Sequence, residues 1–284
     1  MAALLALVSA SLYGAADFFG GLASRQARVL AVVTLAQGTG AVLLLALVPF
    51  LRGASPAASD LWWGAAAGLA GGAGVAWLYR ALAIGTMALV APVTAVCAVA
   101  IPVTVALILG ERPGAVSLIG ITIALLSIVL VSQPPADPHA AGARGWRMPP
   151  GVGIALLSGI AIGFFYLFLA RTSPDAGLWP LVAARLASTS FFAVASAAAA
   201  ASLRIPRRAL LWTVAGGTLD VAANALYLLA ARRGALSIVV TLVSLYPAST
   251  VVLAKVLLGE RFSRVQAVGI VCALIAVLLI VNGT

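Results

Sequence analysis

Ten apolar stretches, each close to the length that crosses a bilayer, follow one another along this chain of 284 residues. A helix needs about 20 mostly apolar residues to span the hydrocarbon core, where its backbone groups must bond to one another. The pattern therefore predicts an all-α polytopic membrane protein with ten transmembrane helices. The expected spans are residues 4–24, 29–51, 61–80, 86–109, 114–132, 151–170, 178–202, 209–231, 236–258 and 264–282.

Composition supports this class and excludes a water-soluble one. Hydrophobic residues make up 63% of the chain and charged residues 8%, whereas about 25% of the residues in a soluble domain are charged. The net charge of +10 reflects arginines in the short turns between the apolar stretches. We interpret these arginines as anchors at the lipid headgroups rather than as a nucleic-acid-binding face. A multi-pass protein of the cell membrane (inner or plasma) is expected.

The sequence repeats itself at a constant offset of 149 residues. The Gly-Glu-Arg that follows the fourth stretch, residues 110–112, recurs after the ninth at residues 259–261. Further matches pair Trp63 with Trp212, Gly14 with Gly163, Gly68 with Gly217, Gly85 with Gly234 and Gly120 with Gly269. This offset predicts two five-helix repeats, residues 1–132 and 150–284, joined by a Pro-rich linker at residues 133–149.

Each repeat contains an odd number of spans, so the second repeat must enter the membrane from the side opposite to the first. The halves then form an inverted-topology repeat about a pseudo-two-fold axis in the membrane plane. Alternating-access transporters are typically built in this way. The Glu-Arg pair that closes the fourth and ninth spans lies within reach of headgroups and water, and we interpret it as a structural helix end rather than a substrate site.

This arrangement resembles the EamA-like family of the drug/metabolite transporter superfamily. The resemblance lies in the two halves of five spans, the apolar run ending in Gly-Glu near the close of the fourth and ninth spans, and a Gly just inside the next helix. It covers residues 4–282. The resemblance implies an inner-membrane carrier of small metabolites with both termini in the cytoplasm.

The positions of the prolines depart from a strict repeat. Pro247 lies thirteen residues before Glu260, which is similar to the family pattern, whereas the first half has Ala98 at that position and Pro102 instead. The two halves are therefore expected to bend differently. Prolines inside spans free backbone carbonyls and permit kinks, so Pro92, Pro102 and Pro247 are candidate hinges, with static kinks as the alternative.

The distribution of charge disagrees with the orientation that the resemblance implies. Cytoplasmic loops usually carry the excess of arginine and lysine. With the N-terminus inside, the cytoplasmic turns hold five arginines and the opposite turns hold ten, which favours an outside N-terminus. The orientation stays open. With the N-terminus inside, the cytoplasmic arginines are Arg52, Arg112, Arg171, Arg232 and Arg233. Those on the opposite side are Arg25, Arg28, Arg80, Arg144, Arg147, Arg204, Arg207, Arg208, Arg261 and Arg264.

Polar residues deep inside spans are the candidates for a functional site, because lipid makes them costly. Asp17 lies in the first span, Arg185 in the seventh, and Asp220 and Asn224 on one face of the eighth. For upright helices, Arg185 and Asp220 reach nearly the same height, which predicts a buried pair, while Asp17 stands more alone. Desolvation favours the neutral form of an isolated carboxyl group, which suits proton coupling. A purely structural pair, with Asp17 hydrated near an interface, is the alternative.

Aromatic and small residues complete the expected cavity and its packing. Tyr166, Tyr227 and Tyr246 are candidate wall residues for substrate binding or coupling, and Gln37 is an expected interhelical hydrogen bonder. The Gly- and Ala-rich stretch at residues 64–74 predicts close helix packing rather than a phosphate loop.

These features favour a secondary-active transporter that exports a small metabolite or amphiphilic organic compound by alternating access, with proton coupling left open. A non-transporting membrane sensor or scaffold is the alternative. An enzyme is not expected, and neither a metal nor a cofactor, since the single histidine (His139) lies in the linker and Cys97 and Cys272 lie among small apolar residues. The expected partners are a small-molecule substrate and the lipid bilayer, without nucleic acid. A homodimer and a monomer both stay open.

Overall fold

The computed structural model describes residues 1–50, 55–85, 87–131, 150–258 and 264–283. The expected linker at residues 133–149 and the second Gly-Glu-Arg at residues 259–261 lie outside these ranges. The described residues form eleven α-helices: α1 (Ala2–Gln26), α2 (Val29–Leu47), α3 (Ala58–Ile84), α4 (Met87–Ile108), α5 (Ala115–Val131), α6 (Val152–Ala170), α7 (Trp179–Ala198), α8 (Arg207–Ala231), α9 (Leu236–Val243), α10 (Tyr246–Leu258) and α11 (Arg264–Asn282).

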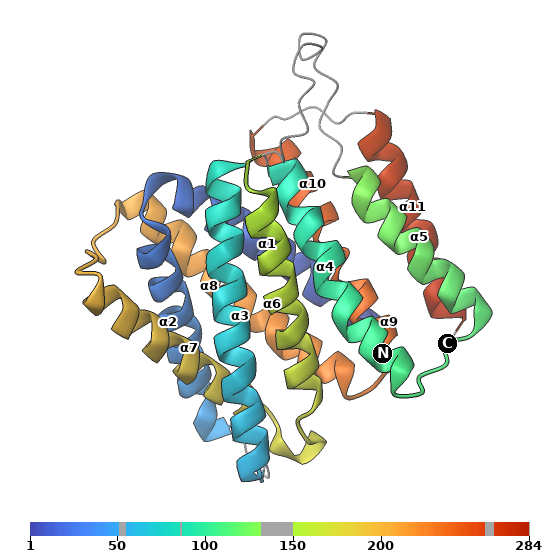
Figure 1. Cartoon of the computed structure of the whole chain (residues 1–284), viewed down its shortest axis with the longest axis horizontal. Helices are drawn as coiled ribbons and strands as arrows, with labels where there is room; N and C mark the ends of the chain where they lie inside the picture. Colours follow the sequence, from blue (N-terminus) through green and yellow to red (C-terminus); the bar gives the residue numbers. More distant parts are fainter. Residues whose placement is uncertain (51–54, 86, 132–149, 259–263, 284) are drawn as a thin grey trace.

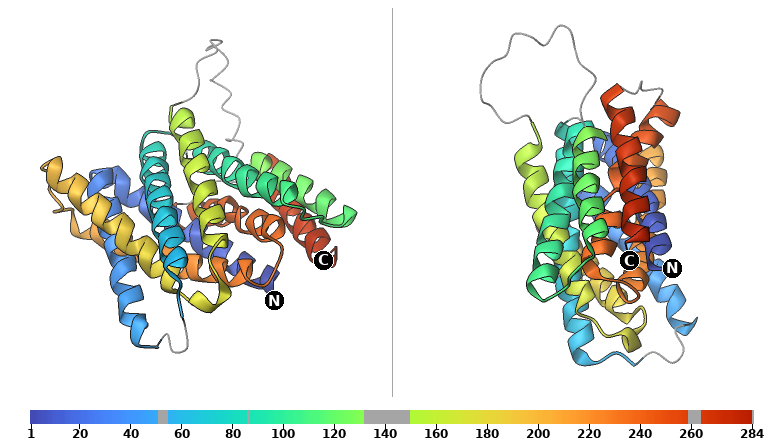
Figure 2. Two further views of the ribbon diagram at one scale, coloured as in Figure 1. Left: turned by 60° about the horizontal axis from the view of Figure 1, so that its bottom comes forward. Right: turned by 90° about the vertical axis from the view of Figure 1, so that its right-hand side faces the viewer.

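The helices match the ten predicted spans, with the ninth span divided between α9 and α10. Six of them, α1, α2, α3, α6, α7 and α8, are long and apolar enough to cross a membrane, and the other spans contain shorter apolar helices. They run side by side in one layered bundle (Figures 1 and 2). The chain is therefore a multi-pass, all-helical membrane protein.

Packing between the helices follows the duplication of the sequence. Helix α1 packs on α8, and its equivalent in the second half, α6, packs on α3. Helix α4 contacts α6 in the same way that α9 and α10 contact α1. The pairs α2 with α7 and α5 with α11 join equivalent helices, and α5 and α11 form one edge of the bundle (Figure 1). Swapping the two halves thus converts these main helix pairs into one another.

Two matching hydrogen bonds show this relation at the level of single residues. The hydroxyl of Ser9 in α1 donates to the carbonyl oxygen of Ala223 in α8 over 2.8 Å. The hydroxyl of Ser158 in α6 donates to the carbonyl oxygen of Gly74 in α3, also over 2.8 Å. Adding 149 to the first serine and subtracting 149 from its acceptor converts one bond into the other. The repeated sequence therefore folds into two equivalent halves.

Glycines bring the backbones of neighbouring helices into direct contact around the centre. Gly64 and Gly68 in α3 lie against the backbone of Pro180 and Ala184 in α7, where a Cβ atom would overlap. This contact confirms the close packing predicted for residues 64–74. It also holds the first turns of α7, and the polar face that follows them, next to the middle of α3.

The expectation that residues 236–258 form a single helix was wrong. Helix α9 ends at Val243 and α10 begins at Tyr246. Pro247 has no backbone N–H, and its ring would clash with the carbonyl of Val243 in a continuous helix, so the chain breaks there. In the first half, Pro92 and Pro102 lie inside the continuous helix α4. The expectation that the halves differ at their prolines is confirmed.

Glu111 lies after the end of α4, as expected, and it also binds the first turn of another helix. Its two carboxylate oxygens accept hydrogen bonds from the backbone N–H groups of Leu236 over 2.8 Å and Ser237 over 3.0 Å. These are free donors in the first turn of α9, where a negative charge is also favoured by the helix dipole. Glu111 therefore joins the end of α4 to the start of α9.

A second set of polar contacts lies at the start of α3. The carboxylate of Asp60 accepts hydrogen bonds from the backbone N–H and the hydroxyl of Ser173, over 2.7 and 2.9 Å. The guanidinium of Arg232, just after α8, donates to the carbonyl oxygen of Ser173 over 3.0 Å. Because spans alternate in direction, these loops and that of Glu111 share one end of the bundle, which we call the linked end. The start of α1 also lies there, since Ala2 adjoins Gly234.

The inverted duplication predicts that equivalent loop positions lie on opposite faces of the membrane. Gln26 and Asp175 are separated by 149 residues, and both are exposed at helix ends. With Cys97 and Cys272 replaced by alanine, we expect a membrane-impermeant maleimide to label Gln26→Cys from one face only and Asp175→Cys from the other face only. Labelling of both positions from the same face would contradict the inverted arrangement.

Candidate functional site

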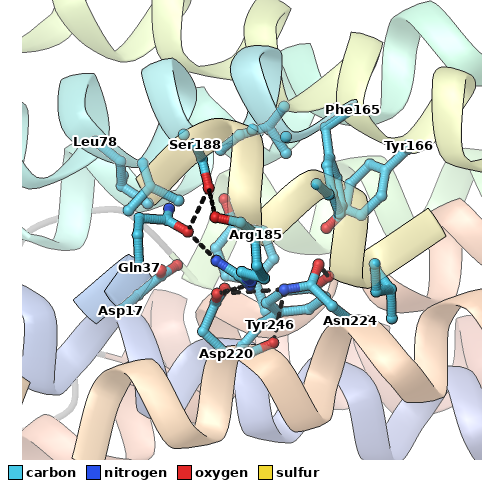
Figure 3. Close-up of a pocket in the computed structure, with 18 residues that line it drawn as sticks. Asp17, Gln37, Leu78, Phe165, Tyr166, Arg185, Ser188, Asp220, Asn224 and Tyr246 are labelled. Atoms are coloured by element: carbon cyan, nitrogen blue, oxygen red, sulfur yellow. Dashed lines mark hydrogen bonds and ion pairs between the residues drawn. The ribbon is translucent and has the colours of Figure 1, made fainter. Parts of the chain in front are cut away.

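A cavity lies where helices from both halves meet in the middle of the bundle. Its walls come from α1, α2 and α3 of the first half and from α6, α7, α8 and α10 of the second. The space that the centres of water molecules can occupy is about 50 Å³, enough for a few waters because one needs about 10–15 Å³. Its polar and aromatic lining residues are Tyr13, Asp17, Gln37, Phe165, Tyr166, Arg185, Ser188, Asp220, Asn224 and Tyr246 (Figure 3).

An ion pair between α7 and α8 forms part of the wall of this cavity. The guanidinium of Arg185 donates to a carboxylate oxygen of Asp220. The side chains of Arg185 and Asp220 are 9% and 16% exposed, so most of the charge of each is shielded from solvent. The pairing predicted from their heights in the membrane is therefore present. What the pair does in binding or coupling stays a prediction.

Neutral polar groups extend the pair on both sides. On α2, the side-chain carbonyl oxygen of Gln37 accepts from the guanidinium of Arg185 and from the hydroxyl of Ser188. On α8, the amide of Asn224 donates to the backbone and carboxylate oxygens of Asp220, over 2.7 and 3.2 Å. The result is a continuous polar network across α2, α7 and α8. The expected interhelical hydrogen bond of Gln37 is confirmed.

Tyr13 connects this network to α1. Its hydroxyl donates to the side-chain oxygen of Asn224 over 2.6 Å. Its ring packs edge-on against the ring of Tyr166, with centroids 6.3 Å apart. Four helices from both halves of the chain are therefore tied to the Arg185–Asp220 pair.

Asp17 lies in the same cavity but outside the network. Its side chain points from α1 toward Gln37 and Arg185 (Figure 3), and the residue is 8% exposed. Among the residues that the structure describes, no hydrogen-bond donor or cation contacts its carboxylate. The expectation that Asp17 stands more alone than Arg185 and Asp220 agrees with this geometry.

The three candidate tyrosines have different positions. Tyr166 and Tyr246 line the cavity, and the hydroxyl of Tyr246 donates to the carbonyl oxygen of Ala91 in α4 over 3.3 Å. Tyr227 does not line it, contrary to expectation. Tyr227 is fully buried, and its hydroxyl donates to the carbonyl oxygen of Tyr166 over 2.7 Å. Although it continues the face of Asp220 along α8, helix α6 covers that end of the face, so Tyr227 supports Tyr166 from behind.

Sequence reasoning missed two lining residues that helical spacing would have indicated. Tyr13 lies four residues before Asp17, and Ser188 lies three residues after Arg185, so each shares a helix face with a predicted charge. No group of three or more metal-ligating side chains occurs within the described part of the chain. The charges available for chemistry in the cavity are thus one guanidinium and two carboxylates.

Comparison with known proteins places this architecture among transporters. The profile of the EamA-like transporter family matches the chain twice, over residues 1–133 and 149–282. A comparison with curated proteins found no match. Among solved structures, 21 chains match. One crystal structure is 18% identical, with 98% of this chain and 95% of that chain covered and a TM-score of 0.69, which shows a shared fold.

The central ion pair predicts unequal costs for losing one charge or both. Arg185→Ala leaves the buried carboxylate of Asp220 without a counter-ion, and removing one partner of a buried pair typically costs about 3 kcal/mol or more. We expect a large fall in the thermal unfolding temperature of the purified protein in detergent. The double variant Arg185→Gln/Asp220→Asn removes both charges of the pair together and should recover most of that loss. A double variant less stable than Arg185→Ala would contradict the pairing.

Proposed function

The chain belongs to the EamA-like transporter family, and from this premise we propose that it exports a small metabolite or amphiphilic organic compound across the cell membrane by alternating access. The observation that carries the proposal is the position of the charged cavity. It lies between two equivalent halves, and both halves supply its walls. Rocking of one half against the other would offer the same side chains to each side in turn.

The size of the cavity supports a carrier in a closed state. Ligand pockets typically enclose about 300–1,000 Å³. A cavity with room for a few waters must widen before a metabolite fits. The break between α9 and α10 lies beside it, because Tyr246 both lines the cavity and begins α10. Pro247 is therefore the best placed of the three candidate hinges, and Pro92 and Pro102 remain candidates in α4.

The linked end offers contacts that must break if the bundle opens there. Asp60, Glu111 and Arg232 bind loops of different helices together through side-chain hydrogen bonds. Alternating access requires that the two ends close in turn. In this proposal, these bonds hold the linked end shut while the opposite end is free to open.

Removing one of these contacts should make the cavity accessible from the linked end. In the alanine-for-cysteine background, Ser188→Cys places a thiol on the cavity wall. We expect Asp60→Ala to speed its labelling by an impermeant methanethiosulfonate from the linked face by about tenfold or more, because a hydrogen bond to a charged group contributes about 1.5–3 kcal/mol. The rate from the other face should not rise. The control Ser202→Ala removes a hydroxyl at the other end of the bundle and should change neither rate. Equal acceleration from both faces would indicate loosening of the fold instead.

We assign the coupling of solute transport to pH to the Arg185–Asp220 pair of the second half. Asp220→Asn keeps the shape and an acceptor oxygen for Arg185 but removes the negative charge. We expect the variant to fold and insert with a lowered unfolding temperature, because Arg185 loses its counter-ion, and to keep its size-exclusion profile. We also expect it to lose pH-dependent solute transport in proteoliposomes. Wild-type flux with unchanged pH dependence would refute this role.

A non-transporting sensor or scaffold is the competing function, and solute exchange separates the two. The purified protein would be reconstituted in liposomes after a screen for metabolites that raise its thermal stability, since ligands of the folded state do so. A carrier accelerates exchange between labelled solute outside and unlabelled solute inside. A sensor binds the same solute and shows no exchange.

A further inference from the structure

Two of the three charged side chains in the cavity, Arg185 and Asp220, pair with each other, whereas Asp17 has no ion-pair partner among the described residues. The guanidinium of Arg185 is shared between Asp220 and Gln37, and Asp220 also accepts from Asn224. Asp17 has no such partner among the described residues, although it is more than nine-tenths buried. The cation of the cavity is therefore already neutralised, and one carboxylate is left over.

An unpaired carboxylate inside the bilayer favours solutes of one charge. Burial of an isolated charge is costly until an opposite charge neutralises it. An anionic solute would meet two carboxylates and a guanidinium that is already occupied. A neutral solute would leave the carboxyl group of Asp17 without a counter-ion. A cation would supply that counter-ion and stabilise the ionised carboxylate.

The aromatic walls favour the same class of solute. The rings of Tyr13, Phe165, Tyr166 and Tyr246 line the cavity. The hydroxyls of Tyr13 and Tyr246 already donate to Asn224 and to the backbone of Ala91. What these two residues offer a solute is therefore mainly their rings, and aromatic rings attract organic cations through their faces.

We infer that the transported compound carries an organic ammonium group, and that Asp17 is the residue that selects for it by serving as its counter-ion. The inference rests on the proposed function and names the substrate class of the same cavity. In this arrangement Asp220 holds Arg185 in place and keeps its charge from repelling the incoming cation. Selectivity comes from the carboxylate that has no partner of its own.

The test compares solutes that differ only in charge. Propylamine, 2-phenylethylamine and tryptamine would each be set beside the alcohol and the carboxylate of the same skeleton. Their binding to the full-length purified protein would be measured as stabilisation against thermal unfolding, and their transport as exchange in proteoliposomes. We expect at least one amine to bind and to be exchanged, with its alcohol and carboxylate analogues binding at least about tenfold more weakly.

The variants assign this selectivity to one side chain. Asp17→Asn keeps the size of the side chain and should weaken binding of the amine at least about tenfold, while Asp17→Glu should retain the preference for the amine. Asp175→Asn, an exposed carboxylate outside the cavity, is the matched control and should bind as wild type. An unliganded unfolding temperature and a size-exclusion profile like those of wild type would show that Asp17→Asn is folded.

The outcomes separate this inference from the proposed function. Exchange of alcohols or carboxylates in preference to amines, unchanged amine binding by Asp17→Asn, or binding of none of the three amines would overturn the assignment of Asp17. The carrier proposal would stand wherever any solute is exchanged. Failure of every solute class, including hits from the metabolite screen, to exchange would remove the carrier function itself.

Discussion

The need to neutralise charge inside a bilayer is the constraint on which the centre of this structure depends. Arg185 can lie in the middle of the bundle because Asp220 supplies its counter-ion and Gln37 accepts a further hydrogen bond. Each partner comes from a different helix, so satisfying one charge requires that α2, α7 and α8 approach closely. The glycines make this approach possible, since Gly217 in α8 has no Cβ to meet the backbone of Ala36 in α2. The charges can therefore pair only because the helices pack closely.

Much of the fold was predictable because its signals are local or periodic. Apolar length gave the spans, and the 149-residue offset gave the repeat, which the paired bonds of Ser9 and Ser158 reproduce in space. The Arg185–Asp220 pair followed from depth alone, because alternating helices bring equal depths to one level. The break after Val243 was missed because a proline in a helix either kinks it or ends it, and the choice depends on neighbours that the sequence does not place. Tyr227 was misplaced for a similar reason, because which helix covers a face depends on tertiary packing.

The backbone is duplicated, but its chemistry is not. At the offset of 149, Asp17 corresponds to Tyr166, Asp220 to Gly71 and Arg185 to Ala36. All six of these positions lie at the helix contacts around the centre, yet the charges of the ion pair belong to the second half alone. A symmetric backbone lets both halves move in equivalent ways. Concentrating the ion pair in one half leaves the first half to contribute a single unpaired carboxylate.

This division has a consequence for how the cavity changes during a transport cycle. The ion pair joins α7 to α8 inside one half and can persist while the halves move as units. The contacts of Gln37 and Tyr13 cross between the halves near the site, and each has a neutral side chain on the first half. Exchanging such a hydrogen bond for water costs less than pulling an ion pair apart in a low-dielectric interior. In the proposed alternating-access cycle, movement between the halves would break the weaker contacts and leave the ion pair inside the second half, with Asp17 left for the solute.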